Sequence, residues 1–222
     1  MKKITILLIF TCLSLWAVGQ KIRVYESRED IAGGTHNTLV VPIFGVDAKT
    51  VLKEWKSEMK SYGAKVSSEK GGLFGDNATF KKMGNNTVDM HARVNEKKDG
   101  GEVDLIVGFD LGGAYLSSSG QPDKYKVAEQ IMHDFAVKLT TNAIDYQLKV
   151  QQKALDKLNG QQKDLVKENK NLNEQIAEYQ DKIKKDQDAI QQNQTDQAAK
   201  QKEISQQQQV VAGTAKKAKA VQ

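Results

Sequence analysis

A regular apolar repeat in the last third of the chain constrains its fold more than any other feature. From Ile144 onward, large apolar residues recur at alternating steps of three and four, the spacing of one stripe along an α-helix. With Leu148 at heptad position a, ten of the seventeen a and d positions up to residue 204 are apolar. The pattern predicts a C-terminal coiled-coil helix, a rod over residues 146–209. The predicted oligomerisation seam comprises Leu148, Leu155, Leu158, Leu165, Asn169, Leu172, Ile176, Tyr179, Ile183, Ile190 and Ile204.

The composition of this seam favours the association of two helices. Leucine at d and isoleucine at the later a positions are typical of two-stranded coils, and Asn169 at an a position fixes register at some cost in stability. We therefore expect the chain to pair with itself as a coiled-coil dimer, or with an envelope protein. Two alternatives stay open, a single solvated helix without a partner and a hairpin folded at Asn159–Gly160. Residues 210–222 contain a glycine and three lysines and predict a flexible basic tail.

Residues 1–19 have the three parts of a secretory signal peptide. Two lysines open the segment, an apolar stretch follows over residues 4–18, and the small residues Ala17 and Gly19 suit a cut before Gln20. The predicted location is the periplasm or the secreted fraction, and an uncleaved anchor is the alternative. No later segment reaches the ~20 apolar residues that span a bilayer, so we expect no transmembrane span after signal removal.

The chain has one cysteine, Cys12, which lies inside the apolar stretch of the predicted signal. The residues before it are not the small ones that a lipoprotein-processing site needs, which disfavours lipidation. Removal of the signal would leave a chain without disulfides, thiolate metal sites or a cysteine nucleophile.

Charge is distributed unevenly along the chain. Residues 20–146 carry 17 basic and 18 acidic side chains, whereas residues 147–222 carry 14 basic and 10 acidic side chains. The basic pI therefore comes from the signal and the C-terminal segment. Because aromatic residues are not interleaved with the basic ones, the sequence does not predict a nucleic-acid partner.

Residues 20–145 predict an α+β domain in which helices pack on one face of an antiparallel sheet. The residues near 88–95 and 103–111 alternate strictly between apolar and polar types, as expected for strands with one buried face. Asp47 is a suitable N-cap for a helix that ends at Gly63, and Pro122 suits the first turn of a second helix. The remaining strands are predicted at 21–26, 37–44, 64–70 and 78–83, with glycine-rich loops at 71–75 and 84–86 and a turn at 99–100.

The element order from Asn37 to Asp145 is similar to a half-repeat of the TATA-binding-protein-like fold. Together with the signal and the heptads, it resembles uncharacterised exported proteins of Bacteroidota that join such an α+β domain to a coiled-coil tail. The resemblance rests on the order of elements, and it implies no functional residues.

Possible reactive groupings in the sequence are sparse. Asp89, His91 and Arg93 share one face of a strand, but a zinc site needs three or four ligands. The glycines of 71–75 lack the Lys-Ser/Thr of a phosphate-binding loop, and the serines of 117–119 have no histidine at a recognisable spacing. We therefore predict no catalytic, cofactor-binding or metal-binding residues, no cofactor, and a solvated face around His91.

These observations favour an exported, non-enzymatic binding or docking protein that self-associates through its coiled coil. The alternative is a periplasmic carrier of an apolar or amphipathic small ligand, and an envelope hydrolase is less favoured. An enclosed pocket between sheet and helices would support the carrier. Exposed aromatic residues on loops, such as Phe74 or Tyr115, would support docking.

Overall fold

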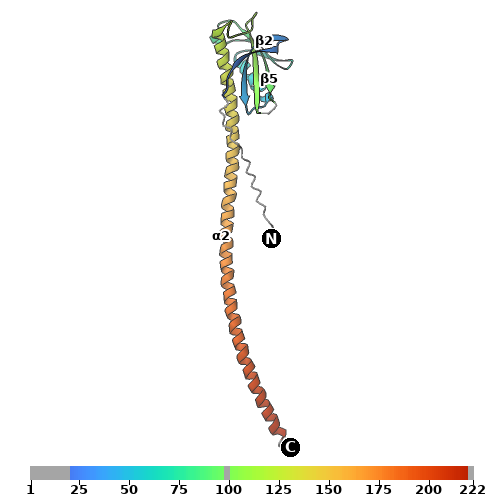
Figure 1. Cartoon of the computed structure of the whole chain (residues 1–222), viewed down its shortest axis with the longest axis vertical. Coiled ribbons are helices and arrows are strands. Elements are labelled where there is room, and N and C mark those ends of the chain that lie inside the picture. Colours follow the sequence, from blue (N-terminus) through green and yellow to red (C-terminus); the bar gives the residue numbers. More distant parts are fainter. Residues whose placement is uncertain (1–20, 98–100, 220–222) are drawn as a thin grey trace. The chain divides into compact units, whose positions relative to one another are not determined.

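A computed structural model describes residues 21–97 and 101–219 of the chain (Figure 1). The first of two compact units ends at Gln151 and the second begins at Gln152. The predicted signal peptide and the predicted turn at 99–100 lie outside the described residues. The elements, in chain order, are β1 (Tyr25–Ile31), β2 (Gly34–Phe44), α1 (Ala48–Ser61), β3 (Lys65–Glu69), β4 (Gly72–Ala78), a 3-10 turn η1 (Lys81–Met83), β5 (Val88–Glu96), β6 (Glu102–Asp110) and α2 (Pro122–Lys219).

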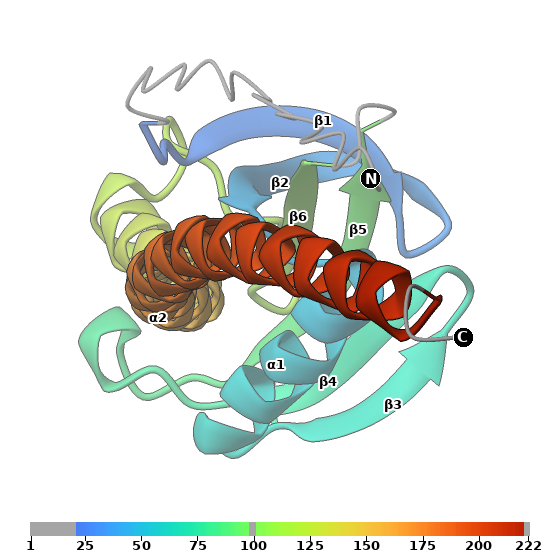
Figure 2. The ribbon, with the colours of Figure 1, turned by 90° about the horizontal axis from the view of Figure 1, so that it is seen from below.

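The strands form one antiparallel sheet of six strands in the order β1-β2-β6-β5-β4-β3. The predicted α+β class and its order of strands and helices are thereby confirmed. Figure 2 shows β1 and β3 at the two edges of the sheet and α1 lying over one of its faces. Both edge strands are polar: β1 reads YESREDI, and β3 has only five residues, KVSSE.

The core lies between one face of the sheet and the two helices. Alternate residues of β2 and β6, such as Leu39 and Leu105, point into it and are fully buried. Trp55 on α1 meets Phe135 on α2 edge to face, with ring centroids 4.8 Å apart. Such aromatic contacts add to the stabilisation that burial provides. We call the other face of the sheet the open face.

The first helix begins and ends where its sequence signals predict. The Asp47 carboxylate accepts hydrogen bonds from the Thr50 amide at 2.9 Å and from the Thr50 hydroxyl at 2.7 Å. These two bonds lower the pKa of Asp47, because they stabilise its charged form. Gly63 follows the helix with a φ of +81°, the left-handed conformation that favours glycine after a helix.

One loop prediction and one strand prediction are wrong. The glycine-rich segment predicted as a loop is strand β4, and the strand predicted at 78–83 gives way to the 3-10 turn η1. The glycines of β4 allow close packing rather than a loop: a Cβ on Gly72 would lie 2.0 Å from the Ala92 carbonyl oxygen, and one on Gly75 would lie 2.6 Å from a Met59 methyl. Strand β1 begins four residues later than predicted, because an exposed, charged edge strand has no clear alternation of apolar and polar residues.

Helix α2 is continuous from Pro122 to Lys219. This excludes the hairpin at Asn159–Gly160, since one glycine costs a helix only about 1 kcal/mol and the hydrogen bonds on both sides persist. Residues 210–219, predicted as part of a flexible tail, are instead the end of α2, and the three alanines and three lysines in this segment are good helix formers. Within the part of the chain that the structure describes, no helix has both the length and the apolar character needed to cross a membrane.

Candidate functional site

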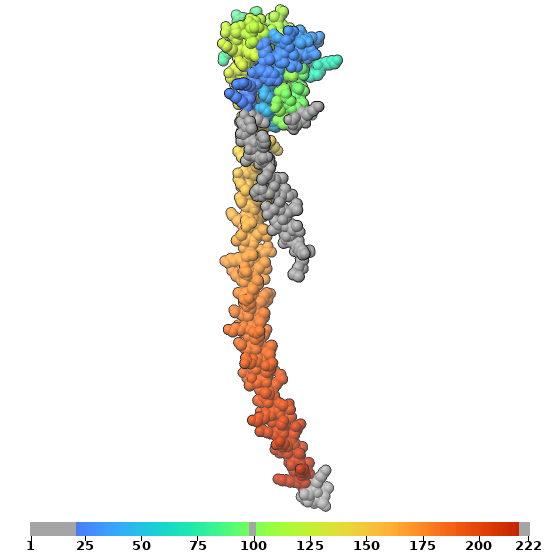
Figure 3. Space-filling model, viewed as in Figure 1, coloured from blue at the N-terminus to red at the C-terminus, as the bar shows by residue number. Residues whose placement is uncertain are grey.

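The predicted oligomerisation seam lies along α2 as one stripe, which we call the α2 seam. Its ten large apolar side chains are each between 44% and 61% exposed. All of them except Leu148 belong to the second unit. Figure 3 shows the second unit, in orange and red, as one slender helix. The α2 seam is therefore a long apolar surface that the described residues leave about half exposed.

Polar residues interrupt the α2 seam at several a and d positions, and some of them bond within the helix. The Asn173 side-chain amide donates to both Asn169 oxygens, the carbonyl and the side-chain oxygen, at 2.9 Å. The Lys200 ammonium donates to Glu203 at 2.5 Å. Asp186 also occupies a d position and is exposed.

The positions that flank the α2 seam carry few charges. From residue 152 to residue 208, eight of the nine e positions are glutamine or asparagine and the ninth is Val166. The g positions from 147 to 210 hold only four charged residues. Charges at e and g normally set partner choice and orientation in coiled coils. They are scarce here, and the flanks are mainly neutral amides. The charged g residues are Glu168, Lys182, Asp196 and Glu203.

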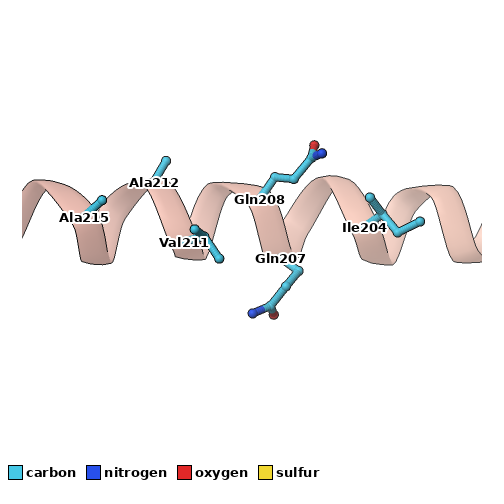
Figure 4. A pocket seen from close by; sticks show the side chains of 6 residues that line it. All are labelled: Ile204, Gln207, Gln208, Val211, Ala212 and Ala215. Atoms are coloured by element: carbon cyan, nitrogen blue, oxygen red, sulfur yellow. The ribbon is translucent and has the colours of Figure 1, made fainter.

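The apolar stripe extends beyond the predicted seam. Val211, one heptad after Ile204, is 58% exposed and continues the a positions. Figure 4 shows these two residues with Gln207 and Gln208, whose side chains point to opposite sides of the helix. The six residues drawn there line a shallow hollow with a volume of about 380 Å³, and all of them come from α2. The predicted seam omits this continuation because residues 210–222 were predicted to form a flexible tail.

The predicted solvated face around His91 is instead a set of half-buried basic side chains, each in contact with a carboxylate. On the open face, His91 Nδ1 lies 2.9 Å from Glu69 Oε2, and Arg93 Nη2 lies 2.7 Å from Glu29 Oε2. The second pair joins β5 to β1, which are not neighbours in the sheet. Asp89 is not part of the cluster; its Oδ1 accepts a hydrogen bond from the Asn77 backbone N–H at 2.8 Å. Each basic group already has a carboxylate partner, so we assign this cluster to holding the strands together.

The two aromatic residues singled out in the sequence also lie on the open face. Phe74 belongs to β4 rather than to a loop, and its ring centroid is 4.8 Å from that of His91. Tyr115 stacks on His36 with centroids 4.0 Å apart and covers Gly108, where a Cβ would lie 3.0 Å from the Tyr115 ring. Burial raises the pKa of the Tyr115 phenol, and the nearby Asp110 carboxylate adds to the effect. Both rings are half-buried and packed against neighbours.

Sequence reasoning missed a groove of about 610 Å³ in the first unit, between the end of α1, residues 79–82 and the first turns of α2. Phe80, only 3% exposed, and Tyr62 form its aromatic floor, with ring centroids 4.6 Å apart. Val127 and Ile131 of α2 complete the apolar lining. Burial, with Glu58 nearby, raises the pKa of the Tyr62 phenol to about 12, so its hydroxyl stays protonated at neutral pH and donates to Glu58 Oε1 at 3.2 Å.

Three lysines surround this groove: Lys81, Lys82 and Lys126. None of them forms an ion pair with a residue that the structure describes. The one acidic residue in the lining, Asp134, accepts a hydrogen bond from Gln130 of its own helix at 2.7 Å. The groove thus combines an apolar floor with an excess of positive charge. No local sequence pattern brings these residues together.

Over residues 21–97 and 101–219, no three histidine, aspartate or glutamate side chains converge in a way that could hold a metal ion. Comparison of the chain with family models, with curated proteins and with solved structures gives no match. The resemblance to the TATA-binding-protein-like fold therefore stays a prediction.

Proposed function

We propose that this chain is an exported, non-enzymatic binding or docking protein that self-associates through the α2 seam. The observation that carries the proposal is the row of ten large apolar side chains, each about half exposed along one face of a continuous helix. Large exposed apolar surfaces on soluble proteins mark interaction sites. A second copy is the simplest partner, because it presents the same stripe with the same spacing.

The energetics support this choice of partner. Burying the remaining half of a large apolar side chain contributes about 1 kcal/mol. Ten such residues from each of two copies then provide roughly 20 kcal/mol, which exceeds the ~4–15 kcal/mol that association costs. A long helix in water also gains most of its stability from packing of its apolar face. Self-association therefore stabilises both the interface and the helix.

The test is sedimentation of the full chain from low to high micromolar concentration. We expect a dimer that changes little between low and high salt, because the e positions of the α2 seam are neutral from residue 152 to residue 208. Sedimentation as a monomer throughout this range would show that the seam does not bind a second copy.

Export is the second part of the proposal and has a separate test. We expect the protein isolated from its own cell to begin at Gln20 or within two residues of it, because the small residues at 17 and 19 suit signal cleavage. N-terminal sequencing of the envelope and medium fractions measures this. Recovery of membrane-bound protein that still begins with Met1 would contradict cleavage.

The groove at Tyr62 favours a second candidate function, the carriage of an amphipathic anion. Its occupant would be a long-chain carboxylate: the chain would lie over Phe80 and Ile131, and the head group would meet the three lysines. Apolar lining with a few polar groups is typical of small-molecule sites. The groove is open to solvent rather than enclosed within the sheet-helix core, which makes the carrier the weaker candidate.

Binding of a fluorescent fatty acid to the full chain tests this second function. We expect saturable binding that weakens about thirtyfold in Lys81→Ala/Lys82→Ala, since each of the two charge-assisted contacts to a carboxylate contributes on the order of 1 kcal/mol. The matched control is Lys138→Ala, because Lys138 is an exposed lysine on α2 that does not line the groove. Equal binding by both variants would assign the affinity to some other surface.

A further inference from the structure

We infer that two copies of α2 pair in antiparallel orientation, centred on Glu174. The inference rests on the proposed self-association and adds the orientation and register of the partner. It follows from a symmetry in the α2 seam, from its charged positions, and from the residues that flank it.

The α2 seam is nearly palindromic about residue 174. In an antiparallel pair each a position faces a d position of the other copy, and the two residues of such a layer lie equally far from the centre. Apolar residues then oppose apolar residues, and polar residues oppose polar ones, in most layers. The matched layers are Leu172 with Ile176, Leu165 with Ile183, Leu158 with Ile190, Ile144 with Ile204, Gln162 with Asp186, and Gln151 with Gln197.

Three layers combine unlike residues, and two of these are compatible with burial. Asn169 opposes Tyr179, whose phenol carries a polar group at its end. Lys200 opposes Leu148 and can lay its aliphatic stem over it while the ammonium reaches water. The remaining layer, Leu155 with Asn193, is the one apolar-to-amide mismatch.

A parallel dimer would instead bring every seam residue against its own copy. Asp186 would face Asp186 and Lys200 would face Lys200, which places two like-charged layers inside the interface. Opposite charges could not compensate across the flanks, because in a parallel pair g faces e and the e positions from 152 to 208 carry no charge. In the antiparallel pair neither Asp186 nor Lys200 meets a like charge.

The flanking charges fit the same register. In an antiparallel pair g positions face g positions, and each g lies nearest to the g that is two residues from its exact mirror position. With the seam centred at residue 174, Glu168 of each copy therefore comes beside Lys182 of the other. Neither residue is used in an ion pair within the described part of its own chain: the Lys182 ammonium lies 5.5 Å from the centroid of the Tyr179 ring. The other two charged g residues face uncharged ones, Asp196 beside Ala154 and Glu203 beside Gln147. The register therefore forms its one possible opposite-charge pair twice and no like-charge pair.

Disulfide trapping tests the orientation directly, because a disulfide forms only when two Cα atoms come within about 7 Å. The full chain with Cys12→Ser provides a background without cysteine, and Leu158→Cys and Ile190→Cys are added in separate chains. We expect neither chain to cross-link with itself, and an equimolar mixture to give a covalent dimer. The register control mixes Leu165→Cys with Ile190→Cys, which lie one heptad out of alignment and should not cross-link.

The outcomes separate the two proposals. If the protein sediments as a dimer and each single-cysteine chain cross-links with itself, the pair is parallel and this inference is wrong, while self-association stands. Cross-linking between positions 165 and 190 would overturn the register. If the protein sediments only as a monomer, the proposed self-association fails and the orientation with it.

A charge exchange gives a second readout that does not depend on oxidation. Glu168→Lys should weaken the dimer several-fold, because it places lysine beside Lys182 of the partner copy. Adding Lys182→Glu in the same chain should restore the affinity. Glu174→Lys, on the outer face of the helix, is the matched control and should change the affinity little. An equal effect of Glu168→Lys with and without the second change would contradict the pairing.

Discussion

Replacing Ile176 and Ile183 by lysine should convert the associated protein into a monomer. Each isoleucine contributes about 1 kcal/mol through the half of its surface that dimerisation buries, so the loss of two from each copy removes about 4 kcal/mol. At about 1.4 kcal/mol per factor of ten, the dimer weakens by about three orders of magnitude. Sedimentation should show a monomer at every concentration tested. Helicity should fall as well, because the long helix loses the packing of its apolar face.

The matched control for this double variant is Ala177→Lys/Gln191→Lys. Ala177 is the outer b position in the heptad of Ile176, and Gln191 is the outer b position in the heptad that follows that of Ile183. The control therefore adds the same number of lysines without entering the seam. The control should sediment like the wild type. In both proteins the near-ultraviolet dichroism of Trp55, which is 1% exposed in the core of the first unit, should melt as in the wild type. An unchanged dimer in Ile176→Lys/Ile183→Lys would show that the α2 seam is not the interface.

A single methyl group at Gly72 should destabilise the sheet by about 3 kcal/mol or more. The Cβ of Gly72→Ala would lie 2.0 Å from the Ala92 carbonyl oxygen and 3.2 Å from the Arg93 Cβ. Relief requires β4 to separate from β5 at a residue where the two strands are in register, Gly72 opposite Arg93. Thermal or denaturant unfolding measures the loss.

The control for this change is Gly101→Ala. Gly101 has no atom within 4 Å of its ideal Cβ position and no positive φ, so it can accept a methyl group. Its unfolding free energy should stay within about 0.5 kcal/mol of the wild type. Equal stability of the two variants would mean that β4 and β5 are not packed as closely as the structure places them.

The sequence was sufficient where a local pattern carries the structural signal. Alternation of apolar and polar residues located β5 and β6 to within about two residues. The Asp47 cap and Gly63 fixed both ends of α1. In these elements, each residue's preference agrees with its place in the tertiary structure.

The sequence was not sufficient where contacts between distant residues decide the structure. Gly72 and Gly75 looked like loop residues, yet they lie in a strand because Ala92 and Met59 occupy the space of their missing side chains. The pair between Glu29 and Arg93 joins residues 64 positions apart. The lysines of the groove at Tyr62 likewise come from two separate segments. No local spacing reports such proximity.

The polar edges of the sheet limit how separate molecules of this protein can associate. An uncovered edge strand offers free backbone groups to any strand of another molecule, and pairing at such edges leads to aggregation. This risk arises whenever two molecules collide. Strand β1 carries four charged residues between Glu26 and Asp30, and β3 is only five residues long with a charge at each end. A neighbouring strand that paired there would have to strip water from those charges, so each sheet remains six strands wide when its copies meet.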